Sequence, residues 1–271
     1  MPFTDLHSHI LPGFDDGASD DGEFLEMARA AERGGTARMA ATPHYDPENP
    51  GLGLEAVIEA TRRHGEMLRG AGIALELIPG VEVRINAGLY RLARGGGDLE
   101  SLTLGEGRRY LLGDLPLIDM PSATADILFR VQLSGIAPIL AHPERNRYLA
   151  TRPEAVRELA ERGVELQVNG GSLEGLYGKA ARASALTLLG EGLARLVASD
   201  AHSLSGRGAD LSAAARIITQ RFGEEAARLL LEVNPERVLA GEPLLDTVPA
   251  MPAARPDRRR MSLGARGRRR R

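Results

Sequence analysis

Short apolar runs alternate with amphipathic helical stretches along most of this 271-residue chain. Strands separated by helices pair in parallel, so the alternation predicts βα units and a parallel sheet. The expected strands are residues 3–7, 37–42, 75–83, 109–113, 137–141, 165–169 and 195–199. Seven strands in regular alternation predict an α/β fold, a closed or nearly closed TIM-like (β/α)7 barrel.

Helix signals flank these strands. Asp20 and Ser122 are plausible N-cap residues, and Pro121 and Pro153 suit the first turn of a helix. The expected helices are residues 20–33, 54–69, 123–134, 153–161, 180–189, 210–222 and 224–231.

The chain divides by charge rather than by a linker. Nothing resembling a linker interrupts residues 1–245, so we expect one domain there, followed by a tail, 246–271. Residues 249–271 carry nine arginines and one aspartate, a local charge of +8. Since the whole chain has a net charge of −3, residues 1–248 have a net charge of −11. The tail is rich in Pro, Ala, Gly and Arg without periodicity, which predicts disorder. A solvated tail without a role is the simplest interpretation, and weak electrostatic contact with an anionic membrane surface, an acidic protein or nucleic acid is the alternative.

Composition excludes several classes of protein. The absence of cysteine excludes disulfides, thiolate metal sites and a cysteine nucleophile. Aromatic residues make up 4% of the chain and there is no Trp, so base stacking has little support and we expect no nucleic-acid partner. No apolar run reaches the roughly 18 residues of a transmembrane segment, and no signal-peptide pattern is present. The expected location is cytoplasmic.

Five of the six histidines lie in short clusters that also carry carboxylates. His7 and His9 are two residues apart, a spacing that places both on one face of a strand, and Asp200 and His202 repeat it. Each cluster lies at or just past the C-terminal end of an expected strand, where βα barrels place their active sites. This pattern predicts a metal-dependent hydrolase.

Further carboxylates near these histidines have competing interpretations. Asp16 is the expected ligand in the first cluster, whereas Asp15 is expected to cap or orient the turn and Asp5 to orient a histidine from outside the ligand set. Glu82 interrupts an apolar run and is costly to bury unless it is paired or metal-bound; the alternative is an edge strand facing solvent. Asp114 ends another apolar run and would otherwise cap a turn.

The remaining candidates complete a metal site. His44 is expected on a loop after an apolar strand, whereas His64, inside a polar helix, is expected at the surface. The pooled ligands are His7, His9, Asp16, His44, Glu82, Asp114, His142, Asp200 and His202. Nine nitrogen and oxygen donors are too many for one ion and suffice for two or three, with Mn, Fe, Zn, Co or Mg all compatible. Such a cluster lowers the pKa of a bridging water and stabilises a leaving oxygen.

Two arginines follow proposed ligands. Arg145 lies three residues after His142, and Arg207 lies in the Gly206-Arg207-Gly208 loop beyond His202. Such residues are surface charges in most proteins. Here a role in gripping phosphate oxygens is the more specific prediction.

These motifs together resemble the polymerase and histidinol phosphatase (PHP) superfamily, over nearly all of residues 3–245. Within it, the stretch 5–18 and the string from His142 to Asn146 resemble the capsule- and exopolysaccharide-locus tyrosine phosphatases. The resemblance implies a distorted seven-stranded βα barrel and a trinuclear, usually Mn-dependent site. It also implies activity on bacterial tyrosine kinases that control polysaccharide polymerisation and export, at their phosphorylated tyrosine-rich tails, and leaves a homo-oligomer open.

Carried over by position, the family's metal ligands fall on the nine pooled residues, and its phosphate-contacting arginines fall on Arg145 and Arg207. One departure is Asp114, where the family commonly has Glu. Aspartate is one methylene shorter, so either the strand shifts or one ion binds more weakly. The basic tail also lies outside the family pattern.

The preferred hypothesis is therefore a metal-dependent phosphotyrosine-protein phosphatase for capsule or exopolysaccharide biosynthesis. Without cysteine, hydrolysis must use metal-activated water attacking phosphorus in line, with no phosphoenzyme. One alternative is a phosphatase for a small metabolite such as histidinol phosphate, which the Asp15-Asp16-Gly17 string disfavours. Another is a non-catalytic, metal-stabilised module that binds a kinase tail, which an apparently complete ligand set disfavours.

Overall fold

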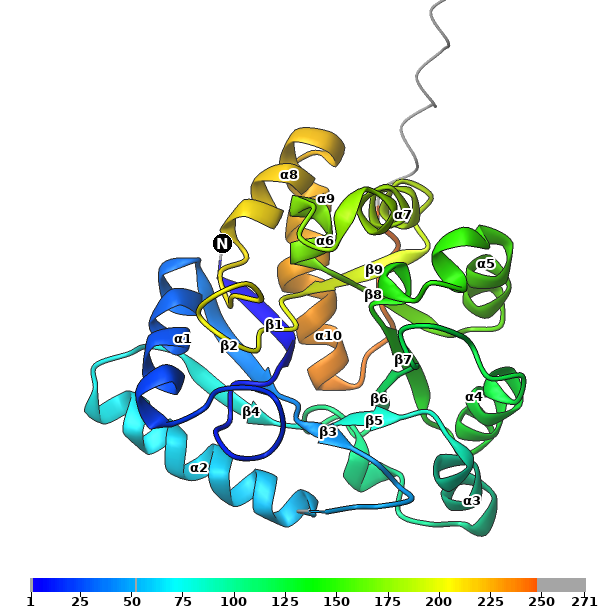
Figure 1. The fold of residues 1–271 in the computed structure, drawn as a ribbon, viewed down its shortest axis with the longest axis horizontal. Helices are drawn as coiled ribbons and strands as arrows, with labels where there is room; N and C mark the ends of the chain where they lie inside the picture. Colours follow the sequence, from blue (N-terminus) through cyan, green and yellow to red (C-terminus); the bar gives the residue numbers. More distant parts are fainter. Residues whose placement is uncertain (1, 52, 248–271) are drawn as a thin grey trace, which may run out of the picture.

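The computed structural model describes residues 2–51 and 53–247 (Figure 1). The expected disorder of the tail therefore lies outside the described residues, apart from Asp246 and Thr247. The strands are β1 (Phe3–Ser8), β2 (Thr36–Ala41), β3 (His44–Tyr45), β4 (Glu76–Pro79), β5 (Glu82–Arg84), β6 (Tyr110–Asp114), β7 (Ala137–Ala141), β8 (Glu165–Asn169) and β9 (Ala194–Ala198).

The strands pair in parallel, in the orders β1-β2-β4 and β3-β5-β6-β7-β8-β9. Two residues separate β2 from β3, and two separate β4 from β5, so each pair continues one strand from the first sheet into the second. The sheets also meet at a parallel bridge between Ser8 and Ala201, beside a 2.9 Å hydrogen bond from Asp200 N to His7 O. The predicted parallel α/β fold is confirmed, and this order of neighbours is compatible with the expected distorted barrel.

The helices are α1 (Asp21–Arg33), α2 (Leu54–Gly70), α3 (Ala87–Gly95), α4 (Thr124–Leu133), α5 (Pro153–Glu161), α6 (Gly170–Glu174), α7 (Gly178–Gly190), α8 (Ser212–Phe222), α9 (Glu224–Arg228) and α10 (Asn234–Ala240). Figure 1 shows α1 to α5 and α7 around the outside of the strands. Among the described residues, no helix combines the length and the apolar character needed to cross a membrane.

Helix α1 shows why these elements form. The Asp20 side chain accepts a 2.9 Å hydrogen bond from Glu23 N, so the expected N-cap is present. Phe24, Met27 and Ala31 form a buried stripe at helical spacing that packs against the strands. The corresponding expectation for Ser122 is wrong, because α4 begins two residues later and its N-cap residue makes no side-chain hydrogen bond.

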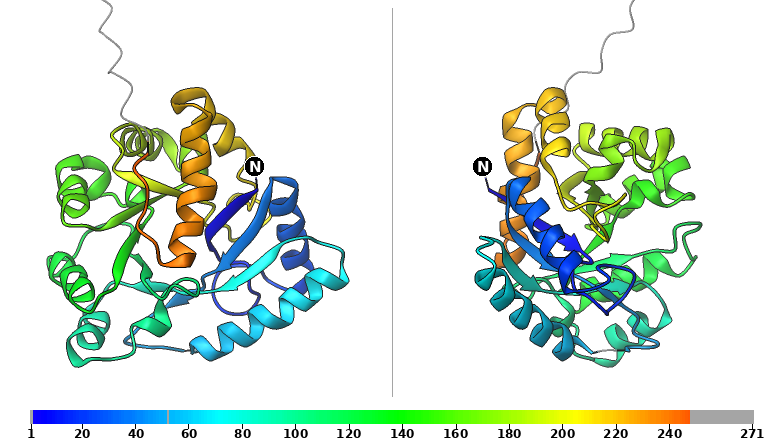
Figure 2. Two further views of the ribbon diagram at one scale, coloured as in Figure 1. Left: turned by 180° about the vertical axis from the view of Figure 1, so that it is seen from behind. Right: turned by 60° about the vertical axis from the view of Figure 1, so that its left-hand side comes forward.

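Helix α10 covers the beginning of the strands. Val238 and Leu239 pack with Leu6, Ile139 and Leu196, which come from three strands. Figure 2 shows α10 crossing the strands when the molecule is seen from behind. The apolar interior is therefore closed at the N-terminal end, which leaves the C-terminal ends of the strands for polar side chains.

Several elements differ from the prediction. The expected strand 75–83 is two strands, because the chain is interrupted at Gly80, where an added Cβ would lie 2.6 Å from Leu104 Cδ2. The short β3, and helices α3, α6 and α10, were not expected. The expected helix 224–231 is α9 followed by a π-helical segment, Leu229–Val233.

The surface position expected for His64 is wrong. Its side chain is fully buried between α2 and α1, with Nδ1 2.7 Å from Ala60 O and Nε2 3.1 Å from Asp21 Oδ1. Its ring also meets the ring of Phe24 edge-on, with centroids 4.7 Å apart. His64 is a hydrogen-bonded core residue.

Candidate metal centre

The nine side chains pooled from the sequence come together at the C-terminal ends of the strands. They form overlapping groups whose ligand-type atoms lie within 4.8 Å of one another. The groups are His7, Glu82 and His142; His7, His9 and Asp200; His44, Glu82 and Asp114; and His9, Asp16, His44 and His202.

The expected convergence of His7 and His9 is seen, with their Nε2 atoms 3.2 Å apart. Strand alternation explains it only in part, because β1 ends at Ser8 and its pairing is irregular between Asp5 and Ser8. Such irregularities re-aim side chains next to active sites. Asp200 also lies beyond its strand, and its φ of 53° turns the chain rather than continuing it.

Glu82 lies at the middle of the cluster and is buried. Its Oε1 lies 3.3 Å from His7 Nε2 and 3.1 Å from His142 Nε2, and its Oε2 lies 2.8 Å from His44 Nδ1. Burial would raise the pKa of this carboxyl, but the three imidazoles outweigh burial and hold the pKa well below its usual range. The alternative of an edge strand facing solvent is wrong, because β5 lies between β3 and β6.

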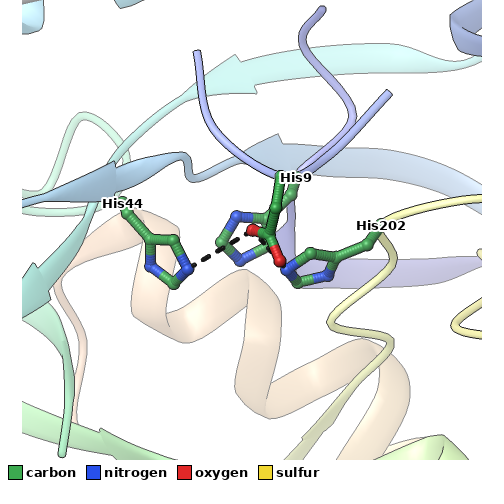
Figure 3. Close-up of side chains that lie close together, drawn as sticks. His9, His44 and His202 are labelled. Atoms are coloured by element: carbon green, nitrogen blue, oxygen red, sulfur yellow. Dashed lines mark ion pairs between the residues drawn. The ribbon is translucent and has the colours of Figure 1, made fainter. Parts of the chain in front are cut away.

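Asp16 meets a second set of imidazoles. Its Oδ1 lies 3.6 Å from His44 Nε2 and 3.3 Å from His202 Nε2. Figure 3 shows the rings of His9, His44 and His202 close together. The rings of His9 and His202 stack, with their centroids 3.8 Å apart. His44 is partly exposed and begins β3, so its expected position on a loop is wrong.

Neighbouring side chains orient the rings. Asp15 Oδ1 accepts a 3.0 Å hydrogen bond from Gly17 N, so Asp15 caps the turn as expected. Its Oδ2 also lies 2.6 Å from His9 Nδ1 and accepts a 2.9 Å hydrogen bond from His44 N, so Asp15 has the histidine-orienting role that was expected of Asp5. Gln167 Oε1 lies 2.9 Å from His7 Nδ1. Partners of this kind leave Nε2 free toward a metal. Asp5 differs from expectation, because its Oδ1 accepts from the backbone N–H groups of His7 and Ser199 and ties β1 to β9.

Electrostatics within the cluster are strong. Burial would lower the pKa of His7, but Glu82 and Asp200 raise it to about 9. The pKa of His9 also rises against burial, to about 10, through Asp15 and Glu82. His202 is the opposite case, because burial and the neighbouring His9 lower its pKa to about 4. A metal ion bound between His7 and His9 must therefore displace protons.

The donor set fits divalent ions. His202 Nε2 and Asp114 Oδ1 are buried and have no hydrogen-bond partner among the described residues, which is costly unless a ligand is bound. Burial, and then Glu82, raise the pKa of Asp114. Asp114 Oδ1 accepts no hydrogen bond from a described residue, which does not support the alternative role of Asp114 as a turn cap. Imidazole and carboxylate donors suit Mn, Fe, Zn, Co or Mg.

Comparison with known proteins identifies the family. Residues 3–240 match the family described as capsular polysaccharide synthesis, CpsB/CapC. The chain belongs to the CpsB/CapC family.

Relatives in the CpsB/CapC family carry phosphatase names. The chain is 35% identical to tyrosine-protein phosphatase YwqE of Bacillus subtilis (strain 168) over 246 residues, 90% of this chain and 94% of that protein. It is 26% identical to tyrosine-protein phosphatase CpsB of Streptococcus pneumoniae, covering 87% and 97%. A crystal structure reported for YwqE and CpsB as unique metal-dependent tyrosine phosphatases superposes with a TM-score of 0.81 at 33% identity, covering 91% of this chain and 98% of the other.

Both expected arginines of this CpsB/CapC chain lie at the rim of the cluster. Arg145 ends a short 3-10 helix that follows His142, and its Nη1 donates to Asp200 Oδ2. Arg207 Nη2 donates to Asp16 Oδ2 at 3.0 Å. Each guanidinium therefore lies against a carboxylate of the cluster.

Three site residues were not expected from the sequence. Besides Gln167, Asn169 Nδ2 donates a 2.7 Å hydrogen bond to Asp200 Oδ2, and the ring of Tyr177 lies 4.1 Å from the Arg145 guanidinium carbon. Gln167 and Asn169 did leave a signal, since they are polar residues at alternate positions in an apolar strand. Tyr177 left none, because it lies in a loop.

Proposed function

We propose that this chain is a metal-dependent phosphotyrosine-protein phosphatase. One observation carries the proposal: a cluster of nine imidazoles and carboxylates has two arginines at its rim. The cluster has the donors for several divalent ions, and guanidinium groups bind phosphoryl oxygens. Membership of a family whose named relatives are tyrosine-protein phosphatases supports the same substrate class.

The proposed ligands are the nine pooled residues, and the proposed ions are two or three Mn²⁺, with Fe, Zn, Co and Mg as the competing identities. Mn rests on the family resemblance, because the donor set alone accepts all five. When bound, such ions supply an activated water nucleophile and stabilise the leaving oxygen.

The protein's own groups bind and orient. Arg145 and Arg207 would turn their planar donors to the phosphoryl oxygens, which compete with the carboxylates that these arginines contact now. Asp15 and Gln167 hold His9 and His7 by Nδ1, so that Nε2 keeps its direction through the reaction. The leaving phenolate has a pKa near 10 and needs less help from an acid than an alkoxide would.

The proposed physiological substrate is the phosphorylated tyrosine-rich tail of a bacterial tyrosine kinase that regulates capsule or exopolysaccharide biosynthesis. The capsular polysaccharide description of the family supports this assignment. The acidic body does not favour nucleic acid as an alternative substrate.

The test couples metal analysis to hydrolysis of a phosphotyrosine peptide. The purified protein is assayed as isolated, after chelation, and after reloading with each candidate ion, and histidinol phosphate is tested in parallel. We expect peptide hydrolysis that chelation abolishes and Mn²⁺ restores. Preference for histidinol phosphate would favour the small-molecule phosphatase. Tight binding of a phosphorylated tail without turnover would favour the non-catalytic module.

A further inference from the structure

Arg145 is held in an unusual way for a phosphate-binding side chain. Only 11% of its side chain is exposed, and among the described residues its side chain donates one hydrogen bond, to Asp200. Asp200 Oδ2 is shared with Asn169 and lies 4.0 Å from Arg207 Nη1. That carboxylate alone does not fix the plane of the Arg145 guanidinium, which can rotate about a single hydrogen bond.

Tyr177 supplies the missing constraint. Its ring lies under the guanidinium, with 4.1 Å between Arg145 Cζ and the ring centroid, within the range of a cation–π contact. The ring is itself confined, because a Cβ added at Gly171 would lie 3.3 Å from Tyr177 Cε2. The Tyr177 hydroxyl is buried beside the Asn169 side chain, without a hydrogen bond of good geometry to a described residue.

We propose that Tyr177 is a positioning residue of the phosphoryl site, whose ring fixes the plane of the Arg145 guanidinium so that its free N–H groups face the incoming phosphoryl oxygens. The inference rests on the proposed function for its substrate. Arg145 directs two of its donors along one plane, so the orientation of that plane decides whether a phosphoryl group is met by two hydrogen bonds or by one.

The test compares variants that separate the ring from the hydroxyl. Tyr177→Phe keeps the ring and removes the hydroxyl, whereas Tyr177→Leu removes the ring as well. If the leucine variant does not fold, Tyr177→Met replaces it, because methionine keeps apolar bulk without a ring. A matched control is Tyr148→Leu, because the Tyr148 ring lies at the same 4.1 Å from Arg152, outside the metal cluster. Binding of inorganic phosphate to the metal-loaded proteins is measured by calorimetry, with metal content and thermal unfolding recorded for each.

We expect Tyr177→Leu to weaken phosphate binding by about 3- to 30-fold, the range of a partly desolvated cation–π contact, with unchanged metal content. Tyr177→Phe and the control at Tyr148 should stay within about twofold of the parent. In hydrolysis of a phosphotyrosine peptide, the loss should appear mainly in KM. In an Arg145→Ala background, the leucine substitution should add less than about twofold, because its effect passes through Arg145.

Three results would overturn the inference: phosphate binding unchanged in Tyr177→Leu, an equal loss in Tyr177→Phe, or a full additional loss in the Arg145→Ala background. The outcome is separable from that of the proposed function. A parent protein that binds phosphate in a Tyr177-dependent way but hydrolyses no phosphotyrosine would refute the function and leave this assignment standing. Hydrolysis without dependence on Tyr177 would do the reverse.

Discussion

Glu82→Gln is the most informative single substitution, because Glu82 contacts more of the cluster than a lone ion pair would. Its two oxygens lie within 3.4 Å of nitrogens on His7, His9, His44 and His142. Glutamine keeps the shape and removes the charge. In metal-loaded protein we expect the loss of bound ions, and in protein stripped of metal we expect a loss of stability that depends on pH.

The magnitude follows from His7. In the metal-free protein its pKa is about 9 against an ordinary 6.5, and Glu82 is the largest of the influences that raise it against burial. A raised folded-state pKa stabilises the protein fully below pH 6.5, and this stabilisation is lost as the pH rises through 9. At 1.36 kcal/mol per pKa unit, the contribution is about 3 kcal/mol at pH 6 and close to zero at pH 9.5. Glu82→Gln should remove most of it.

Urea unfolding in the presence of a chelator measures the effect at pH 6 and pH 9.5. The control is Glu158→Gln, which neutralises an exposed carboxylate paired with Arg162 on α5 and should change stability by less than about 1 kcal/mol. The expected result is a free energy of unfolding lower by about 2–3 kcal/mol at pH 6 and by less than about 1 kcal/mol at pH 9.5, where the remaining loss comes from His9, whose pKa of about 10 Glu82 also helps to raise. A loss of the same size at both pH values would show that the charge of His7 is not its source.

Four further substitutions test other parts of the structure. His142→Ala or Asp200→Ala should lower the rate of phosphotyrosine hydrolysis by more than about 100-fold, because even residues that only support metal ligands are worth about 10- to 100-fold. The circular dichroism spectrum should stay unchanged. Near-normal rates in both variants would rule out the mechanism. Asp114→Glu supplies the longer side chain that the family resemblance implies, and it should tighten binding of a metal ion beside His44. Metal titration measures this affinity. Weaker or equal affinity in the variant would contradict the reasoning. His64→Ala leaves the polar groups around this buried ring unpaired, so it should lower the free energy of unfolding by about 2–3 kcal/mol. The rate of hydrolysis per folded molecule should not change. A change in the free energy of unfolding under about 0.5 kcal/mol would show that the buried contacts of His64 are unimportant.

The later strands could be predicted closely from the sequence. Residues 137–141 and 165–169 are β7 and β8 as expected: the first is a short apolar run, and in the second Leu166 and Val168 alternate with polar residues. The run 75–83 was expected to be one strand, although Pro79-Gly80 within it is a dipeptide typical of turns. Tertiary packing adds to this local signal, because Leu104 and Thr42 approach Gly80 too closely for a side chain. The apolar residues on both sides of the dipeptide outweighed this turn signal, so the break was missed.

The same distinction separates predicted from missed residues in the site. Glu82 and Asp114 were visible because a carboxylate in or after an apolar run is costly unless it has a partner. His64 was misjudged although a signal existed. Val57, Thr61, His64 and Leu68 share the buried face of α2 at spacings of four, three and four residues, and the charged neighbours of His64 obscured this stripe.

The backbone at His142 and Asp200 could not have been predicted at all. Both residues have positive φ, 36° and 53°, a conformation that costs a non-glycine residue about 1–3 kcal/mol. His142 N donates a 2.8 Å hydrogen bond to Gln167 O, and Asp200 N donates a 2.9 Å hydrogen bond to His7 O. Each strained residue is thus held by the neighbouring strand, at a residue that itself belongs to the site. Glycine would relieve the strain at either position, but only a side chain with a nitrogen or oxygen donor extends the cluster. The cost of the backbone is therefore evidence that these two side chains are needed where they lie.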